Sequence, residues 1–170
     1  MKRDDQGKYY WELRACKYWD EFEKPKIIYP DIAKRPEFAY DEEAFYLVNT
    51  LYLLPTDEKW LVNLLNSSIV FWIYTKISSK IRGGFVRFIA QYVSQIPIPN
   101  NSKKKLFSRY IQENFNNLDM LEQENDARIA HLYGLTEEEY DLILNETFMA
   151  DTFRISALNL YRDIAKGKIK

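Results

Sequence analysis

The stretch from Lys76 to Pro99, KISSKIRGGFVRFIAQYVSQIPIP, carries the features on which the interpretation of the whole sequence depends. It follows an apolar run with helical spacing, is interrupted by Gly83-Gly84, and then alternates apolar and polar residues up to a double proline motif. Glycine admits positive φ and close backbone approach, whereas the Ile-Pro pairs must be extended. The stretch carries four basic residues and no acidic one.

The excess of basic over acidic residues extends beyond this stretch. Nine of the 24 basic residues and no acid lie between Lys59 and Gln112, which leaves 15 basic against 25 acidic residues elsewhere. A basic centre between acidic flanks indicates a polyanionic partner such as nucleic acid, although the net charge is only −1. The alternative is a solvated helix face with chance clustering of charge.

The residue pattern predicts a mixed α+β fold, with a small β-sheet and a central buried helix followed by a helical segment. Strands are expected over 26–32 and 45–54, and the helix over about 56–79. Residues 9–19 are expected to form one or two short strands. Gly134 predicts a helix end, and Thr136 with Glu139 predicts a capping box. We place the boundary after residue 100, with a recognition core over 1–100 and a helical segment over 101–170.

The sequence offers no convincing catalytic set. His131 and Cys16 are each the only residue of their type, which argues against a zinc site and excludes an internal disulfide. The three acids Asp41, Glu42 and Glu43 could bind a metal, but a solvated turn is the simpler interpretation. A phosphate-binding loop and a glycine-rich cofactor loop are both missing from the sequence. We therefore expect no catalytic residue, metal ligand or cofactor site in this chain.

The cysteine count and the lengths of the apolar segments indicate the cellular compartment. A single cysteine favours a reducing environment, and neither an apolar signal segment nor an uncharged run of about 20 apolar residues is present. We expect a cytoplasmic protein without a membrane partner.

Several segments occur in a familiar order. These are Tyr10 to Arg14, Phe22 to Tyr29, Leu61 to Ser67, Gly83-Gly84 with Arg87, Tyr92, Gln95 to Pro99, and Leu132 to Glu139. This order resembles the TaqI-like C-terminal specificity domain of type IIG restriction-modification enzymes and adenine-specific DNA methyltransferases. The resemblance covers roughly residues 9–145. It best supports the scaffold positions Pro25, Lys26, Gly84, Arg87 and Pro97.

The resemblance implies a module that recognises a specific double-stranded DNA sequence and has no catalytic residues of its own. A methyltransferase domain that uses S-adenosylmethionine, and any nuclease domain, would precede it in the full-length protein. The alternative is a protein-interaction module that docks to partner subunits of a DNA-modifying complex. For Arg87, the alternative role is a salt bridge that stabilises the glycine turn. The residues expected to contact DNA are Lys76, Lys80, Arg82, Gly83, Gly84, Arg87, Lys103, Lys104 and Lys105.

Overall fold

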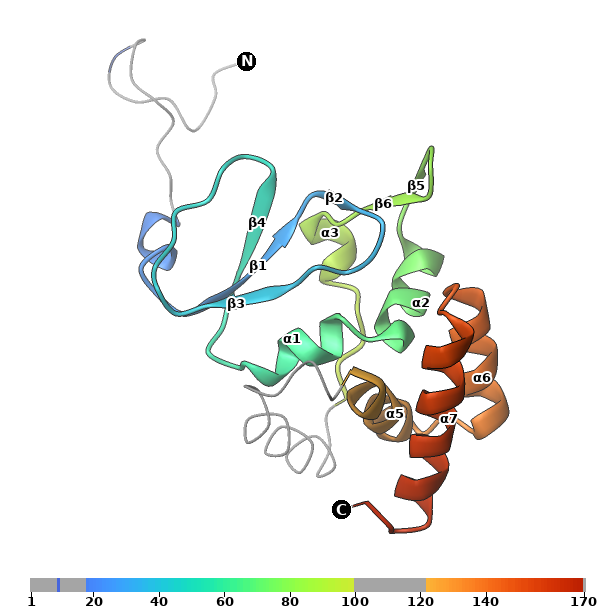
Figure 1. Cartoon of the computed structure of the whole chain (residues 1–170). Coiled ribbons are helices and arrows are strands. Elements are labelled where there is room, and N and C mark those ends of the chain that lie inside the picture. Colours follow the sequence, from blue (N-terminus) through green and yellow to red (C-terminus); the bar gives the residue numbers. More distant parts are fainter. Residues whose placement is uncertain (1–8, 10–17, 100–121, 170) are drawn as a thin grey trace.

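The computed structural model describes residues 9, 18–99 and 122–169 and has the mixed α+β architecture that the sequence predicts. Two small sheets and α3 lie on one side of a short helix pair, and three C-terminal helices lie on the other (Figure 1). In chain order the described elements are η1 (Trp19–Glu21), β1 (Lys26–Pro30), β2 (Ile32–Ala33), β3 (Ala39–Asp41), β4 (Leu51–Pro55), α1 (Trp60–Leu65), α2 (Ser68–Ile77), β5 (Lys80–Ile81), β6 (Phe85–Arg87), α3 (Ala90–Val93), α5 (Glu122–Tyr133), α6 (Glu137–Glu146) and α7 (Asp151–Ala165).

The first sheet is antiparallel in the order β3-β1-β4, so β1 is its central strand. The predicted strand over 26–32 is divided at Asp31, where the chain leaves this sheet and enters the second one as β2. Pro30 is the last residue of β1 and pairs only with Leu51 of β4, because the pairing with β3 ends at Ile28, so proline occupies a position with a strand on one side only. The second sheet is antiparallel in the order β2-β6-β5.

The strand pair expected over 45–54 is a single strand, β4. Residues 45–50 form a loop instead, because Ala44 adopts a left-handed φ of 58° and the amide of Leu51 bonds back to Val48. A positive φ at alanine is unfavourable and breaks the extended path that a hairpin strand needs.

A buried ion pair joins β1 to β3. The Lys26 ammonium lies 2.5 Å from an Asp41 carboxylate oxygen, and both side chains are almost fully buried. Burial raises the pKa of Asp41, but hydrogen bonds from Lys26 and the amides of Glu43 and Phe45 outweigh it, and the pKa is lowered. Asp41 is thus a core residue, and the interpretation of residues 41–43 as a solvated turn is wrong for Asp41.

The predicted central helix is two helices, α1 and α2, separated at Asn66-Ser67. The Asn66 side chain forms two hydrogen bonds to the backbone of Phe38, while the Ser67 hydroxyl accepts a bond from the amide of Val70 and caps α2. Apolar spacing continues across the break, so periodicity alone predicts one helix. Helix α1 also begins later than expected, at Trp60, and Thr56 accepts a hydrogen bond from the amide of Glu58.

The C-terminal helices follow the local signals closely. Gly134 has a φ of 72° after α5, and Thr136 and Glu139 form both hydrogen bonds of a capping box at the start of α6. Both predictions are confirmed. The predicted strands over 9–19 and the boundary near residue 100 fall largely on residues 10–17 and 100–121, outside the described part of the chain.

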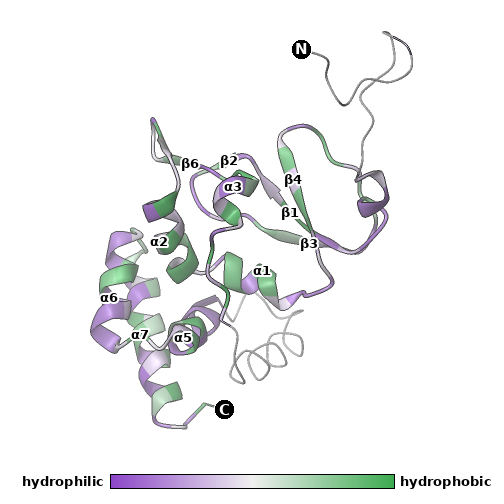
Figure 2. Cartoon of the chain, turned by 180° about the vertical axis from the view of Figure 1, so that it is seen from behind, coloured by the Kyte–Doolittle hydropathy of each residue, from purple (hydrophilic) through white to green (hydrophobic). Residues whose placement is uncertain are grey.

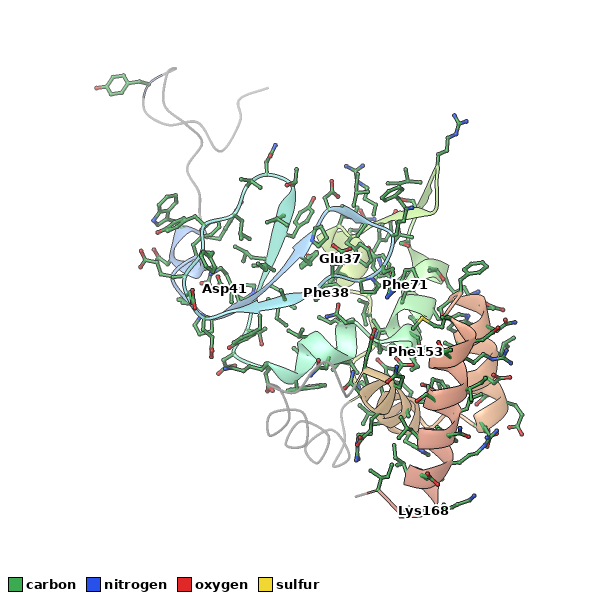
Figure 3. The ribbon with its side chains drawn as sticks, in the orientation of Figure 1. Glu37, Phe38, Asp41, Phe71, Phe153 and Lys168 are labelled. Atoms are coloured by element: carbon green, nitrogen blue, oxygen red, sulfur yellow. The ribbon has the colours of Figure 1, made fainter. Side chains whose placement is uncertain are left out.

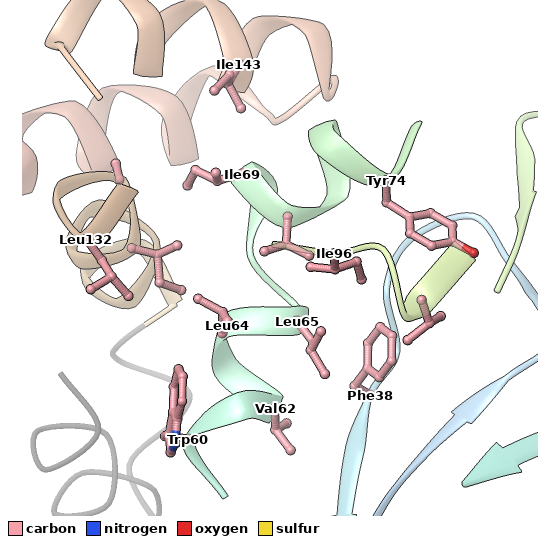
Figure 4. Close-up of a cluster of buried hydrophobic side chains, with 14 of the residues drawn as sticks. Phe38, Trp60, Val62, Leu64, Leu65, Ile69, Tyr74, Ile96, Leu132 and Ile143 are labelled. Atoms are coloured by element: carbon pink, nitrogen blue, oxygen red, sulfur yellow. The ribbon is translucent and has the colours of Figure 1, made fainter. Parts of the chain in front are cut away.

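The buried core extends across α2 in both directions (Figure 4). Ile69 faces Leu132 of α5 and Ile143 of α6, whereas Tyr74 points towards the sheets. Figure 2 colours most of α2 as hydrophobic, whereas hydrophobic and hydrophilic residues alternate along α6 and α7. Helix α2 therefore belongs to a core shared by the N-terminal and C-terminal parts.

Asp126 of α5 connects three helices from within this core. One carboxylate oxygen accepts from the Ser68 amide at 2.7 Å, and the other accepts from the Ser68 and Tyr140 hydroxyls at 2.5 and 2.8 Å. Burial raises the pKa of Asp126 above its ordinary value, although these three donors act in the opposite direction.

The Asp126→Asn variant should differ from the wild type in its pH dependence. A carboxyl whose folded pKa is raised loses its stabilising contribution as pH rises above the unfolded value of about 4. The wild-type free energy of unfolding, minus that of the variant, should therefore decrease between pH 4 and pH 8 in urea titrations. Asp151→Asn, at an exposed position, is the matched control. A difference that grows with pH would show that the hydrogen bonds outweigh burial.

Candidate nucleic-acid interface

The β5–β6 hairpin projects from the body of the molecule beside the end of α2 (Figure 1). Its turn consists of Arg82, Gly83 and Gly84, and the two glycines have φ values of 87° and 80°. A Cβ at Gly84 would meet no heavy atom within 4 Å, so the glycine is required by its backbone conformation alone. The predicted glycine turn is therefore present, and it exposes its backbone to solvent.

The base of the hairpin is anchored in the core. Tyr74 of α2 stacks on Phe88 with ring centroids 4.6 Å apart, and its hydroxyl donates to the Arg87 carbonyl at 2.5 Å. The Phe88 amide donates in turn to the Asp31 carbonyl at 2.6 Å. Burial raises the pKa of Tyr74, which keeps this phenol protonated as a donor. These contacts fix the direction in which the exposed turn points.

Arg87 extends from β6 with about half of its side chain exposed and pairs with Asp31. Its Nε and Nη2 atoms lie 3.2 and 3.3 Å from the two carboxylate oxygens. The hydrogen bonds that Arg87 donates to the Asp31 carboxylate raise the pKa of Arg87. The pair links β6 to the residue that precedes β2, a role close to the salt-bridge alternative, although it leaves about half of the Arg87 side chain exposed.

Two basic residues that sequence reasoning missed lie beside this hairpin. Lys34 and Arg35 follow β2, and β2 pairs with β6 so that Ala33 opposes Val86. The Lys34 ammonium lies 5.2 Å from the centre of the Phe85 ring, and both basic side chains are exposed. Both residues lie outside the acid-free segment 59–112. The adjacent Lys-Arg pair was the available signal, but only strand pairing places it at the hairpin.

Lys76 occupies a different environment. It lies on the last turn of α2, pairs with Glu146 of α6 at 2.8 Å, and sits 4.8 Å from the centre of the Trp72 ring. The Trp72 indole also donates to Glu146. Lys76 therefore contacts an acidic residue of the C-terminal helices, while its side chain stays largely exposed.

The structure describes only some of the other residues that we predicted to contact DNA. The backbone of Lys80 belongs to β5, opposite Val86. Lys103, Lys104 and Lys105 lie outside the described residues. We call Lys34, Arg35, Arg82 and Arg87, with the Gly83-Gly84 turn, the basic hairpin face.

His131 serves the packing of the C-terminal helices. Its ring stacks on Tyr161 with centroids 3.9 Å apart, and its Nε2 lies 2.9 Å from the Tyr161 carbonyl. Among the residues that the structure describes, no three acidic, histidine or cysteine side chains form a group able to hold a metal ion. Within the same ranges, every helix is too short or too polar to cross a bilayer.

The sequence is also similar to known proteins. The sequence model of the TaqI-like C-terminal specificity domain matches residues 3–98. Type II methyltransferase M.BstVI of Geobacillus stearothermophilus is 28% identical over 131 residues, which are 71% of this chain and 22% of the relative. Type II methyltransferase M.XhoI of Xanthomonas vasicola is 32% identical over 124 residues, or 70% of this chain and 22% of the relative. The chain thus spans about a fifth of the length of these curated relatives.

Replacing Tyr74 by Phe tests the anchor of the hairpin. The stack on Phe88 would remain, but the Arg87 carbonyl would lose its bond from a buried donor, so we expect a loss of about 1–2 kcal/mol in unfolding free energy. Tyr133→Phe is the control, because that hydroxyl bonds the more exposed Pro97 carbonyl and should cost below about 1 kcal/mol. Urea denaturation of both variants gives the comparison, and equal losses would contradict a special role for Tyr74.

Proposed function

The chain belongs to the family of TaqI-like C-terminal specificity domains, the target-recognition modules of restriction-modification systems, and we propose from this premise that it reads double-stranded DNA through its basic hairpin face. The observation that carries the proposal is the convergence of Arg82 and Arg87 with Lys34 and Arg35 around a projecting, glycine-containing turn. A polyanion is attracted by such a cluster, and a narrow hairpin can enter a DNA groove.

Different residues of this face suit different parts of DNA. Exposed Arg82 and Lys34 can neutralise phosphates, and Lys76, Lys80 and Lys103 to Lys105 would add to that attraction. The Gly83-Gly84 turn lets backbone amides approach a phosphate oxygen without a side chain between them. These contacts set the position of the protein on the duplex and are independent of base sequence.

Arg87 is the residue we propose for base recognition. Its guanidinium already holds a planar, two-point arrangement with the Asp31 carboxylate. Guanine presents O6 and N7 acceptors to the same fork of donors, so DNA could replace or share the Asp31 partner. The ion pair would then keep the side chain extended before DNA binds.

Catalysis belongs, in this proposal, to another part of the protein. The curated relatives are methyltransferases by name and are several times longer than this chain. We infer that S-adenosylmethionine and the methyl transfer to adenine lie in a preceding methyltransferase domain. The domain division at residue 100, the location in the cytoplasm and any nuclease activity remain expectations from the sequence.

A salt titration tests the DNA proposal. Binding to mixed duplex DNA should weaken steeply with salt, and removing one phosphate contact should lower the slope of log K against log salt by about 0.9. We expect Arg82→Ala and Lys34→Ala to have this effect on all sequences alike. Lys168→Ala, at the C-terminal end far from the hairpin (Figure 3), is the control and should leave the slope unchanged. Absence of binding at low salt would refute the proposal for this chain.

Arg87→Ala separates base recognition from a structural role. If Arg87 reads a base, selection from a randomised duplex library should show a loss of about 1–3 kcal/mol of discrimination at one position. Its exposed pair with Asp31 should contribute little to stability. Asp31→Asn is the matched variant, which weakens the pair but keeps the arginine and should retain the preference. An unaltered preference in Arg87→Ala, with a reduced melting temperature, would favour the structural role.

A further inference from the structure

A cluster of aromatic rings lies on the surface at the other end of the molecule. We call Tyr18, Trp19, Phe22, Phe45 and Tyr46 the aromatic patch. Trp19 and Phe22 each lie 5.3 Å from the Tyr46 ring, between centroids, and Phe22 stacks on Tyr46 at an interplanar angle of 17°. Four of the five rings are more than half exposed. Single exposed apolar residues are ordinary, but the rings of Tyr18, Trp19, Phe22 and Tyr46 contact one another, and such a group of large rings indicates a binding surface.

The patch is held in place by the buried Lys26–Asp41 pair. The Lys26 ammonium donates to the Phe22 carbonyl at 2.7 Å, which fixes the end of η1. The Asp41 carboxylate accepts from the amides of Glu43 and Phe45, which fixes the loop that carries the other rings. One buried ion pair thus positions both segments of the patch.

The loop conformation is also unfavourable by itself. Ala44, between those two amides, has a φ of 58°, which a residue with a Cβ rarely adopts. Helix η1 and the loop after β3 are therefore ordered by interior contacts while their largest side chains face solvent. Such pre-ordering lowers the entropy lost when a partner binds.

The charge around the patch argues against DNA as its partner. The segments 18–24 and 42–48 contain Asp20, Glu21, Glu23, Glu42 and Glu43 but only one basic residue, Lys24. Lys24 is itself paired with Glu21, and Lys59, from outside these segments, pairs with Glu42, so the acids remain in excess. An acidic border repels phosphates and attracts a surface with basic residues. Figure 1 places η1 at the end of the molecule opposite the β5–β6 hairpin.

We propose that the aromatic patch docks onto the methyltransferase part of the protein, on a surface with an apolar centre and a basic border. The family is by description a C-terminal domain, and the chain spans about a fifth of its curated relatives, so most of such a protein lies outside this chain. The proposal rests on family membership and on the inferred methyltransferase part, but does not require the hairpin to bind DNA.

This arrangement assigns the two surfaces different partners. The basic hairpin face would remain available to DNA while the aromatic patch is covered by protein. The patch would then fix the orientation of the recognition module relative to the catalytic part, which linker residues alone could not do.

Hydrogen exchange tests the proposal without DNA. The amides of residues 18–24 and 42–48 should exchange at least about tenfold more slowly in the polypeptide that carries the methyltransferase part together with this chain than in this chain alone. The double variant Trp19→Ser, Tyr46→Ser should abolish the difference, and the charge reversal Asp20→Lys, Glu23→Lys should reduce it without removing a ring. Ile155→Ser, at an exposed apolar residue of α7, is the control and should retain it.

The other outcomes overturn the proposal. Equal exchange rates in the two proteins would show that the patch stays exposed or is covered by this chain itself. Protection that arises only after duplex DNA is added would assign the patch to DNA. Protection that increases with the concentration of this chain alone, together with a dimer in sedimentation, would assign it to a second copy. Failure of DNA binding in the salt titration would leave the exchange comparison made without DNA unaffected.

Discussion

Burial of α2 on two sides is the constraint on which the rest of the structure depends. Tyr74 connects this helix to the base of the hairpin, and the amide and hydroxyl of Ser68, at its start, both donate hydrogen bonds to the Asp126 carboxylate of α5. A helix that loses water on both sides must be apolar nearly all round, and the residues of α2 meet that requirement. The sheets and the C-terminal helices therefore share one core, and moving either would expose α2.

A second buried contact organises the opposite end of the molecule. The Lys26–Asp41 pair gains little over a hydrophobic pair of the same size, because both charges must be desolvated. The pair instead fixes nearby backbone, because Lys26 also donates to the Phe22 carbonyl and Asp41 accepts from the amides of Glu43 and Phe45. The core thus positions a basic face at one end and an aromatic face at the other, which suits a module that joins DNA to a catalytic domain.

Arg87 illustrates how an observed structural contact can be compatible with a proposed binding role that the sequence treats as its alternative. The sequence left open whether it contacts DNA or forms a salt bridge. The structure contains the ion pair with Asp31, yet leaves about half of the arginine side chain exposed. Because an exposed pair contributes little free energy, it can hold the guanidinium extended and still release it to a competing acceptor.

The sequence by itself determined what depends on neighbours within a few residues: the glycine turn at 83–84, the helix end at Gly134, the capping box at Thr136, and the family of the chain. Only the tertiary structure decided the break at Asn66, where the amide side chain binds Phe38, and the burial of Asp41 against Lys26. It also brought Lys34 and Arg35 to the hairpin through the pairing of β2 with β6. Turns and caps are set by local backbone geometry, whereas ion pairs, helix breaks and convergent charges depend on which distant segments the buried core brings into contact.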